Sequence, residues 1–281
     1  MIRFGPGGNS DSFYEEGQKS TLDVPRWLFD RGLNAYEYQC TRGVRITQAF
    51  AQALKVQAER FDIALSIHAP YYINLSGTDP VLLEKSRHHL VKSLQAAKWM
   101  GATRVVFHPG SASKLPRSEA LLLAGRFLDN FLANIDDELL ENCDLCPETM
   151  GKRNQLGSLE EVLALCKLHP RIRPAVDFGH LHARGGGSLL EEKDFEIILE
   201  KIDQHLGKEA VENLHVHFSP VEFTGAGEKK HGTLKDKEFG PDFYPLAKVL
   251  KQNKLRPTVI CESAGTQAED AAAFKSLYHS I

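Results

Sequence analysis

The sequence predicts an α/β protein of the (β/α)8 TIM-barrel class, folded as one domain over residues 1–281. Three observations predict it. Eight short runs of β-type residues recur at intervals of about 35 residues, helical patterns lie between them, and no linker or composition break interrupts the series. A doubly wound sheet is the alternative arrangement, but the length and the eightfold count favour the barrel.

The expected strands are short and rich in β-branched, aromatic and small residues. They are Ile2–Phe4, Ala35–Cys40, Ala64–His68, Arg104–His108, Asp144–Glu148, Arg173–Asp177, Asn213–His217 and Thr258–Glu262. Pro147 lies inside the fifth of these strands, where a proline cannot donate its share of the ladder. We therefore expect a bulge at this position.

Helical patterns fill the intervals between the strands, and two of them carry clear start signals. Asp79 followed by Pro80 predicts the N-cap and first position of a long helix that ends at Met100. Ser158 and Glu161 form a capping-box pattern. Other helices are expected over 21–30, 47–61, 192–205, 242–253 and 266–278. The polar, glycine-rich stretches 183–188 and 219–240 are expected to be loops that are either functional or mobile.

Composition excludes several classes of protein. With 42% hydrophobic and 25% charged residues, the chain is neither disordered nor fibrous. No apolar run reaches the roughly 18 residues of a membrane span, and no signal-peptide pattern opens the sequence, so we expect a cytoplasmic protein. We also expect a monomer. Five cysteines do not indicate a disulfide framework. The net charge of −3 does not by itself indicate a nucleic-acid partner.

Histidines and acids stand at the carboxyl ends of the expected strands. Five strands end in such a residue, and the seventh carries two histidines on one face: His68, His108, Glu148, Asp177, Glu262, His215 and His217. The next inward positions below them hold small or apolar residues: Ser66, Val106, Cys146, Ala175 and Ile260. The sequence therefore predicts an uncharged floor under a ring of imidazoles and carboxylates at the catalytic mouth of the barrel.

This ring has the chemistry of a metal centre. A single histidine at a strand end is usually structural, but six such coincidences at equivalent ends favour a shared site. Histidine and carboxylate together suit Zn²⁺, and also Mn²⁺ or Fe²⁺. His180 and His231 add two further imidazoles, so the donors exceed the needs of one ion. We expect two or three ions, an arrangement used for phosphodiester hydrolysis.

Five segments resemble the endonuclease IV family of apurinic/apyrimidinic (AP) endonucleases, which are xylose-isomerase-like barrels with three zinc ions. The resemblance runs in order along most of the chain. The segments are Ser66-Ile-His-Ala-Pro-Tyr-Tyr-Ile-Asn-Leu75, Phe107-His-Pro-Gly-Ser111, Pro147-Glu-Thr-Met-Gly151, Asp177-Phe-Gly-His180 and Ile260-Cys-Glu-Ser263.

The resemblance implies a role for each matched residue. Glu148 would bridge two metals, of which one is completed by His68 and His108. Asp177, His215 and Glu262 would complete the other, and His180 and His231 would belong to a third. The implied catalytic residues are Glu148, Asp177 and Glu262. The implied reaction is base-excision repair: a hydroxide bridging two metals attacks the phosphate 5′ to an abasic site in double-stranded DNA.

The resemblance also implies a DNA-binding rim. Tyr71 and Tyr72 stand where the family inserts side chains into DNA, and Arg42 is near a second DNA-probing position. Lys229 and Lys230 are candidate phosphate contacts. They also mark a departure, because the family's third-metal pair reads Asp-x-His where this chain reads Lys229-Lys230-His231. Glu228, His182 and His217 remain open as replacements for the missing ligand.

A second enzyme class fits part of the same pattern. Sugar isomerases and epimerases of this superfamily use one divalent ion, which Glu148, Asp177, His215 and Glu262 would hold here. The two glutamates would then move a proton beside a carbonyl. A barrel that only binds a ligand is a third possibility, disfavoured by the intact ring. One ion per chain indicates the isomerase, and two or three indicate the nuclease.

Overall fold

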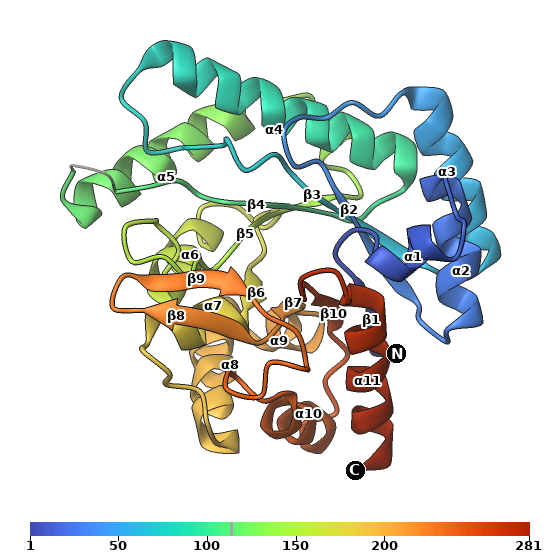
Figure 1. The fold of residues 1–281 in the computed structure, drawn as a ribbon. Coiled ribbons are helices and arrows are strands. Elements are labelled where there is room, and N and C mark those ends of the chain that lie inside the picture. The colour runs from blue at the N-terminus through green and yellow to red at the C-terminus, as the bar shows by residue number, and fades with distance from the viewer. Residues whose placement is uncertain (113–114) are drawn as a thin grey trace.

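A computed structural model describes residues 1–112 and 115–281. Within these residues, eight parallel strands form a barrel enclosed by helices, which confirms the predicted fold (Figure 1). The barrel strands are β1 (Arg3–Pro6), β2 (Ala35–Gln39), β3 (Ala64–His68), β4 (Arg104–Phe107), β5 (Asp144–Pro147), β6 (Ala175–Asp177), β7 (His215–Phe218) and β10 (Thr258–Cys261). Each lies within about two residues of its expected position.

The barrel consists of two four-stranded sheets joined by isolated bridges. One sheet has the order β1-β10-β7-β6 and the other β2-β3-β4-β5. Gly7 bridges to Glu37 at one seam, and Glu148 bridges to Ala175 at the other. Pro147 lies at this second seam, between the Leu145 and Thr149 amides that donate to the next strand. Its missing N–H therefore falls where the ladder is already interrupted, and the described register of β4 and β5 runs through Pro147 without the expected bulge.

Helices cover the outside of the barrel, and the expected caps are confirmed. The Asp79 side chain accepts a hydrogen bond from the Val81 amide, and Ser158 and Glu161 form a reciprocal capping box. The helices are α1 (Asp11–Glu15), α2 (Val24–Asp30), α3 (Gln48–Arg60), α4 (Pro80–Met100), α5 (Arg117–Ala133), α6 (Leu159–Cys166), α7 (Phe178–Arg184), α8 (Glu192–Leu206), α9 (Lys208–Glu212), α10 (Phe243–Gln252) and α11 (Gln267–Ser280), with 3-10 turns at Thr21–Asp23 and Asp137–Leu139. In the described part of the chain, none of them has the length and apolar character of a bilayer-crossing helix.

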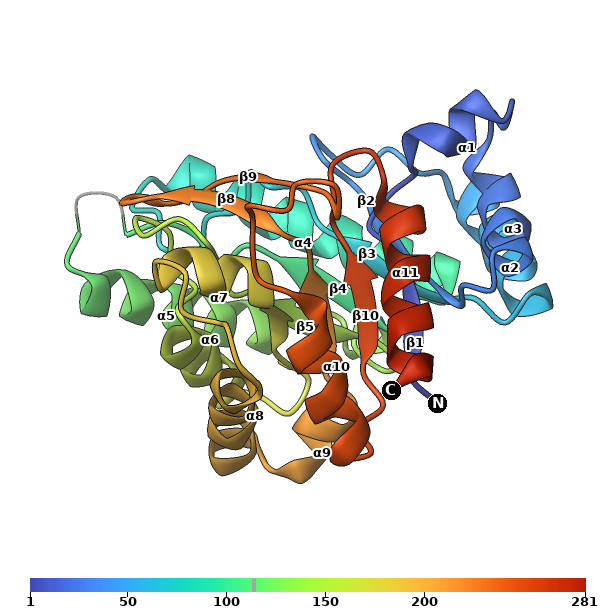
Figure 2. The same ribbon diagram turned by 60° about the horizontal axis from the view of Figure 1, so that its bottom comes forward.

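The long loop expected over 219–240 contains a β-hairpin. Strands β8 (Val221–Thr224) and β9 (Gly227–His231) pair antiparallel and lie across one end of the barrel strands (Figure 2). Alternation is weak in this polar stretch, which is why no strand is expected there from the sequence. The ladder shifts register because Glu222 faces Lys230 while Phe223 faces Glu228, which leaves Lys229 as an extra residue.

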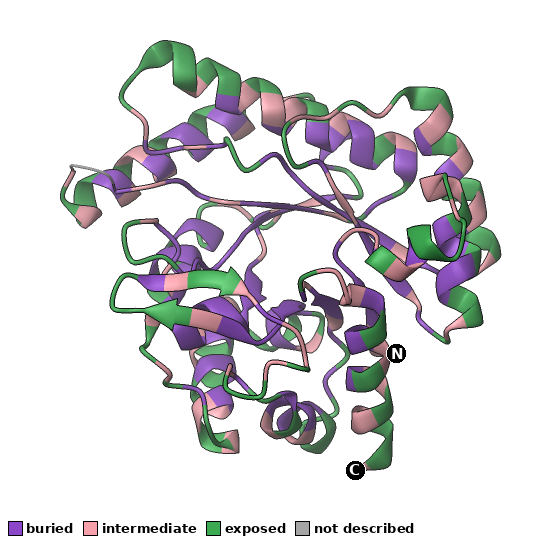
Figure 3. Ribbon diagram, in the orientation of Figure 1, coloured by how far each residue is buried: buried purple, intermediate pink, exposed green. Residues whose placement is uncertain are grey.

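The hydrophobic core is divided by the strands. Most of it fills the space between strands and helices, and the inward faces of the helices are buried while their outer faces are exposed (Figure 3). Val106, Cys146 and Ala175 form a separate buried cluster. These three are positions that the sequence assigned to the inward face, and they are packed in the barrel interior as expected.

Candidate metal centre

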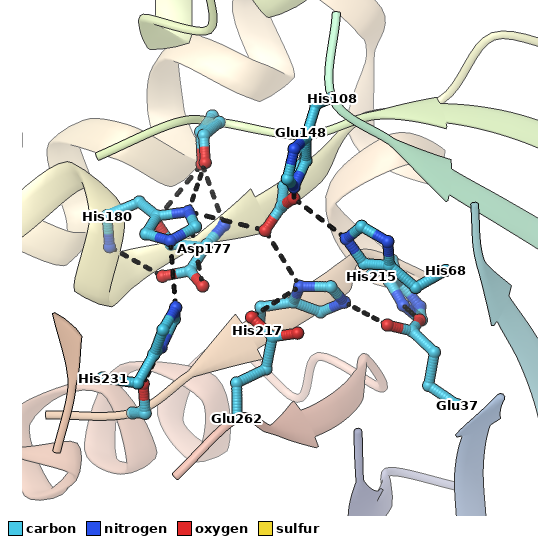
Figure 4. Close-up of polar contacts among 12 residues, drawn as sticks. Glu37, His68, His108, Glu148, Asp177, His180, His215, His217, His231 and Glu262 are labelled. Atoms are coloured by element: carbon cyan, nitrogen blue, oxygen red, sulfur yellow. Dashed lines mark hydrogen bonds and ion pairs between the residues drawn. The ribbon is translucent and has the colours of Figure 1, made fainter. Parts of the chain in front are cut away.

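A cavity of about 220 Å³ opens between the carboxyl ends of the strands and the hairpin. Polar side chains line it and point toward one another (Figure 4). We call the mouth cluster the histidines and acids that line the cavity together with Asp177 and His217, which contact them: His68, His108, Glu148, Asp177, His180, His217, Glu228, His231 and Glu262. Every strand-end histidine and acid of the predicted ring except His215 belongs to it.

One part of the mouth cluster joins β3, β4 and β5 through His68, His108 and Glu148. The Nε2 atoms of His68 and His108 lie 3.3 and 3.2 Å from Glu148 Oε2. His68 Nδ1 is 2.8 Å from the Ala69 carbonyl oxygen, to which it donates. The unprotonated Nε2 of a neutral His68 therefore faces the cavity, as a metal-ligating imidazole requires.

A second part shares Glu148 through its other oxygen. His217 Nδ1 lies 3.1 Å from Glu148 Oε1 and 3.4 Å from Glu262 Oε2. Ligand atoms of these three residues and of Asp177 all lie within 4.8 Å of one another. Asp177 Oδ1 accepts a hydrogen bond from the His180 amide, whereas the buried Asp177 Oδ2 has no hydrogen-bond partner among the described residues.

The third part joins α7 to the hairpin. His180 Nε2 lies 3.3 Å from His231 Nε2 and 3.3 Å from Glu228 Oε2. His180 Nδ1 donates to the Thr149 carbonyl oxygen at 2.9 Å, which leaves its Nε2 lone pair facing the other two residues. The extra residue in β9 lets both Glu228 and His231 face the mouth, although they are three positions apart.

Gly151 makes room for this third part. A Cβ atom at Gly151 would lie 2.5 Å from Glu228 Cβ and 3.1 Å from His180 Cδ2. Gly227, at the tip of the hairpin, has a φ of 98° and packs so closely on the Gly151 carbonyl that a side chain would not fit. The loop after β5 and the hairpin therefore fix Glu228 against His180.

The electrostatics of the mouth cluster match a site for cations. Burial raises the pKa of Asp177 to about 6, against the opposing charge of His180. Burial also opposes ionisation of Glu148, but hydrogen bonds from His108, His217 and His68 hold its pKa well below the usual range. For His68, burial is outweighed by Glu148, which raises the pKa to about 9. The pKa values of His180 and His217 are raised as well, so protons on these three histidines balance the buried carboxylates when no metal is bound.

The spacing of the ligand atoms also fits divalent metals. Bonds of about 2.0–2.2 Å in a tetrahedral site place neighbouring ligand atoms roughly 3.3–3.5 Å apart. The contacts around Glu148 span 3.1–3.5 Å, at or beyond the long end of N–H···O hydrogen bonds. With the unpartnered Asp177 oxygen of the described site, this spacing indicates that the residues fit metal ions.

The seventh strand differs from its expected role. His217, one inward position above His215, lies with Glu148 and Glu262, whereas His215 lies deeper in the barrel. There His215 Nε2 is 2.8 Å from Oε2 of the buried Glu37, whose Oε1 is 2.9 Å from His217 Nε2. Glu37 also accepts from the Ser66 hydroxyl at 2.9 Å. We call Glu37, Ser66 and His215 the lower layer.

The lower layer corrects the expected uncharged floor, because it places a carboxylate beneath the mouth. Sequence reasoning missed Glu37, which lies in a polar-looking second strand where an isolated acid gives no metal signal. Its inward position is the one available clue: Glu37 pairs in register with Ser66, which the sequence assigned to the inward face. The contact itself joins residues 178 positions apart.

Lys229, Lys230 and His182 lie outside the mouth cluster. Lys229 and Lys230 are exposed and pair with Glu222 on the outer side of the hairpin, so neither enters the mouth cluster. His182, one of the open replacements for the third-metal ligand, accepts from the Leu189 amide and packs against Phe223. Of the three replacements, Glu228 and His217 lie in the mouth cluster, and Glu228 is the one beside His180.

The predicted DNA-probing residues lie together at the rim. The Tyr71 and Tyr72 rings lie 4.7 Å apart between centroids and are 46% and 57% exposed. Arg42 Nε donates to the Tyr71 hydroxyl at 3.4 Å. Tyr71 also lines the cavity, so this exposed aromatic pair adjoins the mouth cluster.

Comparison with known proteins identifies a shared sequence pattern. A sequence model of the xylose isomerase-like TIM barrel family matches residues 25–277. An uncharacterised protein of Methanocaldococcus jannaschii, MJ0133, is 36% identical over 94% of this chain and 92% of its own length. A probable endonuclease 4 of Mycoplasma pneumoniae is 29% identical over 68% of this chain and 64% of its own length.

Solved structures with the same architecture include proteins named as nucleases and proteins named as epimerases. Endonuclease IV from Thermus thermophilus aligns with a TM-score of 0.72 at 22% identity, over 99% of this chain and 100% of that one. A D-tagatose 3-epimerase-like protein aligns with a TM-score of 0.74 at 18% identity, over 100% and 98%. Structural similarity at this level of sequence identity establishes the fold, and the reaction must be inferred from the residues of the site.

Proposed function

The chain belongs to the xylose isomerase-like TIM barrel family, and on that premise we propose that it is a metal-dependent hydrolase that incises DNA 5′ to abasic sites. One observation carries the proposal. The two oxygens of Glu148 face two separate sets of ligands, with His68 and His108 on one side and His217 on the other. A carboxylate placed in this way suits a two-metal phosphodiesterase.

The mouth cluster offers ligands for three ions, for which Zn²⁺ is the first candidate and Mn²⁺ or Fe²⁺ the alternatives. The three sets are His68, His108 and Glu148; Glu148, Asp177, His217 and Glu262; and His180, Glu228 and His231. When bound, such ions supply Lewis-acid stabilisation of a phosphate and a water of lowered pKa. Each residue of these three sets contributes by holding its ligating nitrogen or oxygen atom in place.

The rim would position the substrate. Tyr71 and Tyr72 offer exposed rings on which bases exposed at a damaged site can stack. Arg42, which contacts Tyr71, adds a planar cation beside them. Lys229 and Lys230 lie on the outer side of the hairpin above the mouth, where they could contact phosphates. Because the chain carries a net charge of −3, these local cations are the expected source of salt-dependent binding.

A sugar epimerase is the second candidate, and a specific observation favours it. Glu148, Asp177, His217 and Glu262 form a complete group with two glutamates, which one divalent ion and a proton shuttle would require. That group leaves His68 and His108 without a role, although both face Glu148. The extra histidines therefore favour the nuclease.

Cleavage of a defined duplex tests the proposal. The purified protein, supplied with Zn²⁺ or Mn²⁺, should nick DNA that carries a tetrahydrofuran abasic analogue on its 5′ side. Glu148→Gln should lower the rate at least about a thousand-fold, because it removes a ligand shared by two sets. Lys235→Ala, an exposed lysine outside the rim, is the matched control and should nick normally.

Metal content separates the two candidates. Two or three ions per chain with nicking would support the nuclease. One ion per chain, with turnover of a ketose and intact DNA, would support the epimerase and contradict the proposal.

A further inference from the structure

The lower layer holds a carboxylate that the proposed chemistry does not use. Glu37 on β2 and His215 on β7 are fully buried in the barrel interior, beneath the mouth cluster (Figure 4). A buried carboxylate is costly unless its oxygens face donors. Glu37 meets this condition with contacts of 2.8, 2.9 and 2.9 Å to His215, His217 and Ser66.

The hydrogen bonds of the lower layer run in one direction, set by Arg104 at the start of β4. A guanidinium can only donate, so Arg104 Nη1, 3.2 Å from His215 Nδ1, makes that nitrogen an acceptor. The proton of a neutral His215 then lies on Nε2, which donates to Glu37 Oε2.

Glu37 presents its other oxygen to His217. The 2.9 Å contact between Glu37 Oε1 and His217 Nε2 is bent away from hydrogen-bond alignment, so it is an ion-pair contact. An anionic oxygen at this distance still favours a proton on Nε2 over a lone pair there. The charge of the carboxylate therefore favours the form of His217 that carries its proton on Nε2.

The position of the His217 proton determines which ring nitrogen offers a lone pair to the mouth cluster. With its Nε2 proton toward Glu37, a neutral His217 presents the lone pair of Nδ1 toward Glu148 Oε1 and Glu262 Oε2, at 3.1 and 3.4 Å. His68 and His180 are fixed differently, because each donates Nδ1 to a backbone carbonyl. His217 points its Nε2 into the barrel, where strand carbonyls are used by the ladder, so a side chain must face the proton.

The lower layer is a support for His217 and not a further metal site. Its imidazole–carboxylate distances of 2.8 and 2.9 Å are shorter than the 3.1–3.5 Å spacing around Glu148. Both oxygens of Glu37 already face a donor within 3 Å, in contrast to Asp177 Oδ2, which has no hydrogen-bond partner among the described residues.

We propose that Glu37 and His215 are positioning residues, which hold His217 as an Nδ1 ligand of the metal centre. The inference rests on the metal centre of the proposed function and is independent of the substrate. Outer residues that orient a ligating imidazole typically change metal affinity by 10- to 100-fold. We therefore expect Glu37 to act on metal binding even though it lies too deep to touch an ion held at the mouth.

Metal titration of the full-length chain tests the inference. The apoprotein is titrated with Zn²⁺ against a competing chelator, and Glu37→Gln is compared with the wild type. A glutamine offers one acceptor to two facing imidazole donors, so one of them stays unpaired. We expect about 10- to 100-fold weaker binding at the ion that His217 holds. Asp270→Asn is the matched control, because Asp270 is a buried acceptor for Leu234 and Thr266 outside the site.

Ring-nitrogen NMR of His217 gives a readout that a merely structural role would not move. The zinc-loaded wild type should show zinc on Nδ1 and a proton on Nε2. A second pair of variants guards against misfolding of Glu37→Gln: His215→Gln keeps a donor for Glu37, and His215→Leu removes it. We expect His215→Leu to weaken zinc binding more than His215→Gln.

The outcomes separate this inference from the proposed function. Unchanged zinc affinity in Glu37→Gln, equal affinities in the two His215 variants, or zinc on Nε2 of His217 would overturn the positioning role. A wild-type chain that binds no zinc and no Mn²⁺ would overturn the metal centre itself.

Discussion

The mouth cluster and the lower layer are built from the same residue types but differ in how their atoms are paired. In the lower layer, Glu37 contacts three donors at 2.8–2.9 Å. In the mouth cluster, the contacts of Glu148 are longer, and one oxygen of Asp177 finds no hydrogen-bond partner in the described part of the chain. His217 connects the two layers, because it contacts Glu37 below and Glu148 above.

The difference shows what separates a metal site from a buried network of charges and hydrogen bonds. Where every carboxylate oxygen has a close donor, the charge is balanced by the protein alone. Where donors converge at larger spacing and an acceptor remains free, a cation completes the balance. The residue types alone do not distinguish these cases, because histidine and glutamate serve both.

Removal of metal is the strongest way to test this contrast. Chelation should lower the melting temperature of the metal-loaded protein, because bound ions stabilise the folded chain by about 2.7 kcal/mol per site at a hundredfold excess over Kd. For a chain of this size that corresponds to roughly 5 °C per site. Differential scanning calorimetry with and without EDTA measures the shift. An unchanged melting temperature would mean that the mouth cluster is balanced without ions, like the lower layer.

The hairpin offers a more selective test inside the mouth cluster. Glu228→Gln should weaken one ion by about 10- to 100-fold and leave the other two in place, because the partners of Glu228 in the cluster are His180 and His231. Lys229→Ala, one residue further on, should keep all ions, since its side chain faces Glu222 outside. Metal analysis after gel filtration distinguishes them. Equal metal loss in both variants would contradict the assigned faces of β9.

The smallest expected effect concerns a carboxylate outside both layers. Glu161 Oε2 accepts from the Gly157 and Ser158 amides, and Arg117 pairs with the same carboxylate. Burial opposes its ionisation, but Arg117 and these amides lower the pKa of Glu161 below its usual range. A lowered pKa means stability that is present above the unfolded pKa and lost as the pH falls through the folded one.

Glu161→Gln should therefore cost less than about 1 kcal/mol at pH 7, because its partner Arg117 is partly exposed. The difference from the wild type should shrink as the pH falls below about 4.5, the range in which an ordinary glutamate protonates. Urea unfolding of both apoproteins at several pH values measures it. A difference that grows toward low pH would show that this carboxylate is not stabilised by its partners.

Much of the fold could be predicted from the sequence because its signals are local. Strand runs, the Asp79-Pro80 helix start and the Ser158 capping box each depend on a few neighbouring residues, and all are found in the structure. The hairpin of β8 and β9 was missed because its strands are polar and short. Its bulge also explains why the spacing of Glu228 and His231 matched no expected pattern.

The sequence by itself determined that imidazoles and carboxylates stand at the carboxyl ends of the barrel strands, since alternation along each strand fixes which residues face inward. It could not determine at which level along the barrel axis each side chain lies. His215 and His217 share an inward face and differ by two residues, or about 6.6 Å along the strand. The stagger between strands in the closed barrel decides which of them meets Glu148 and which meets Glu37. Only the tertiary structure sets that stagger, because it depends on contacts between strands that are far apart in the chain.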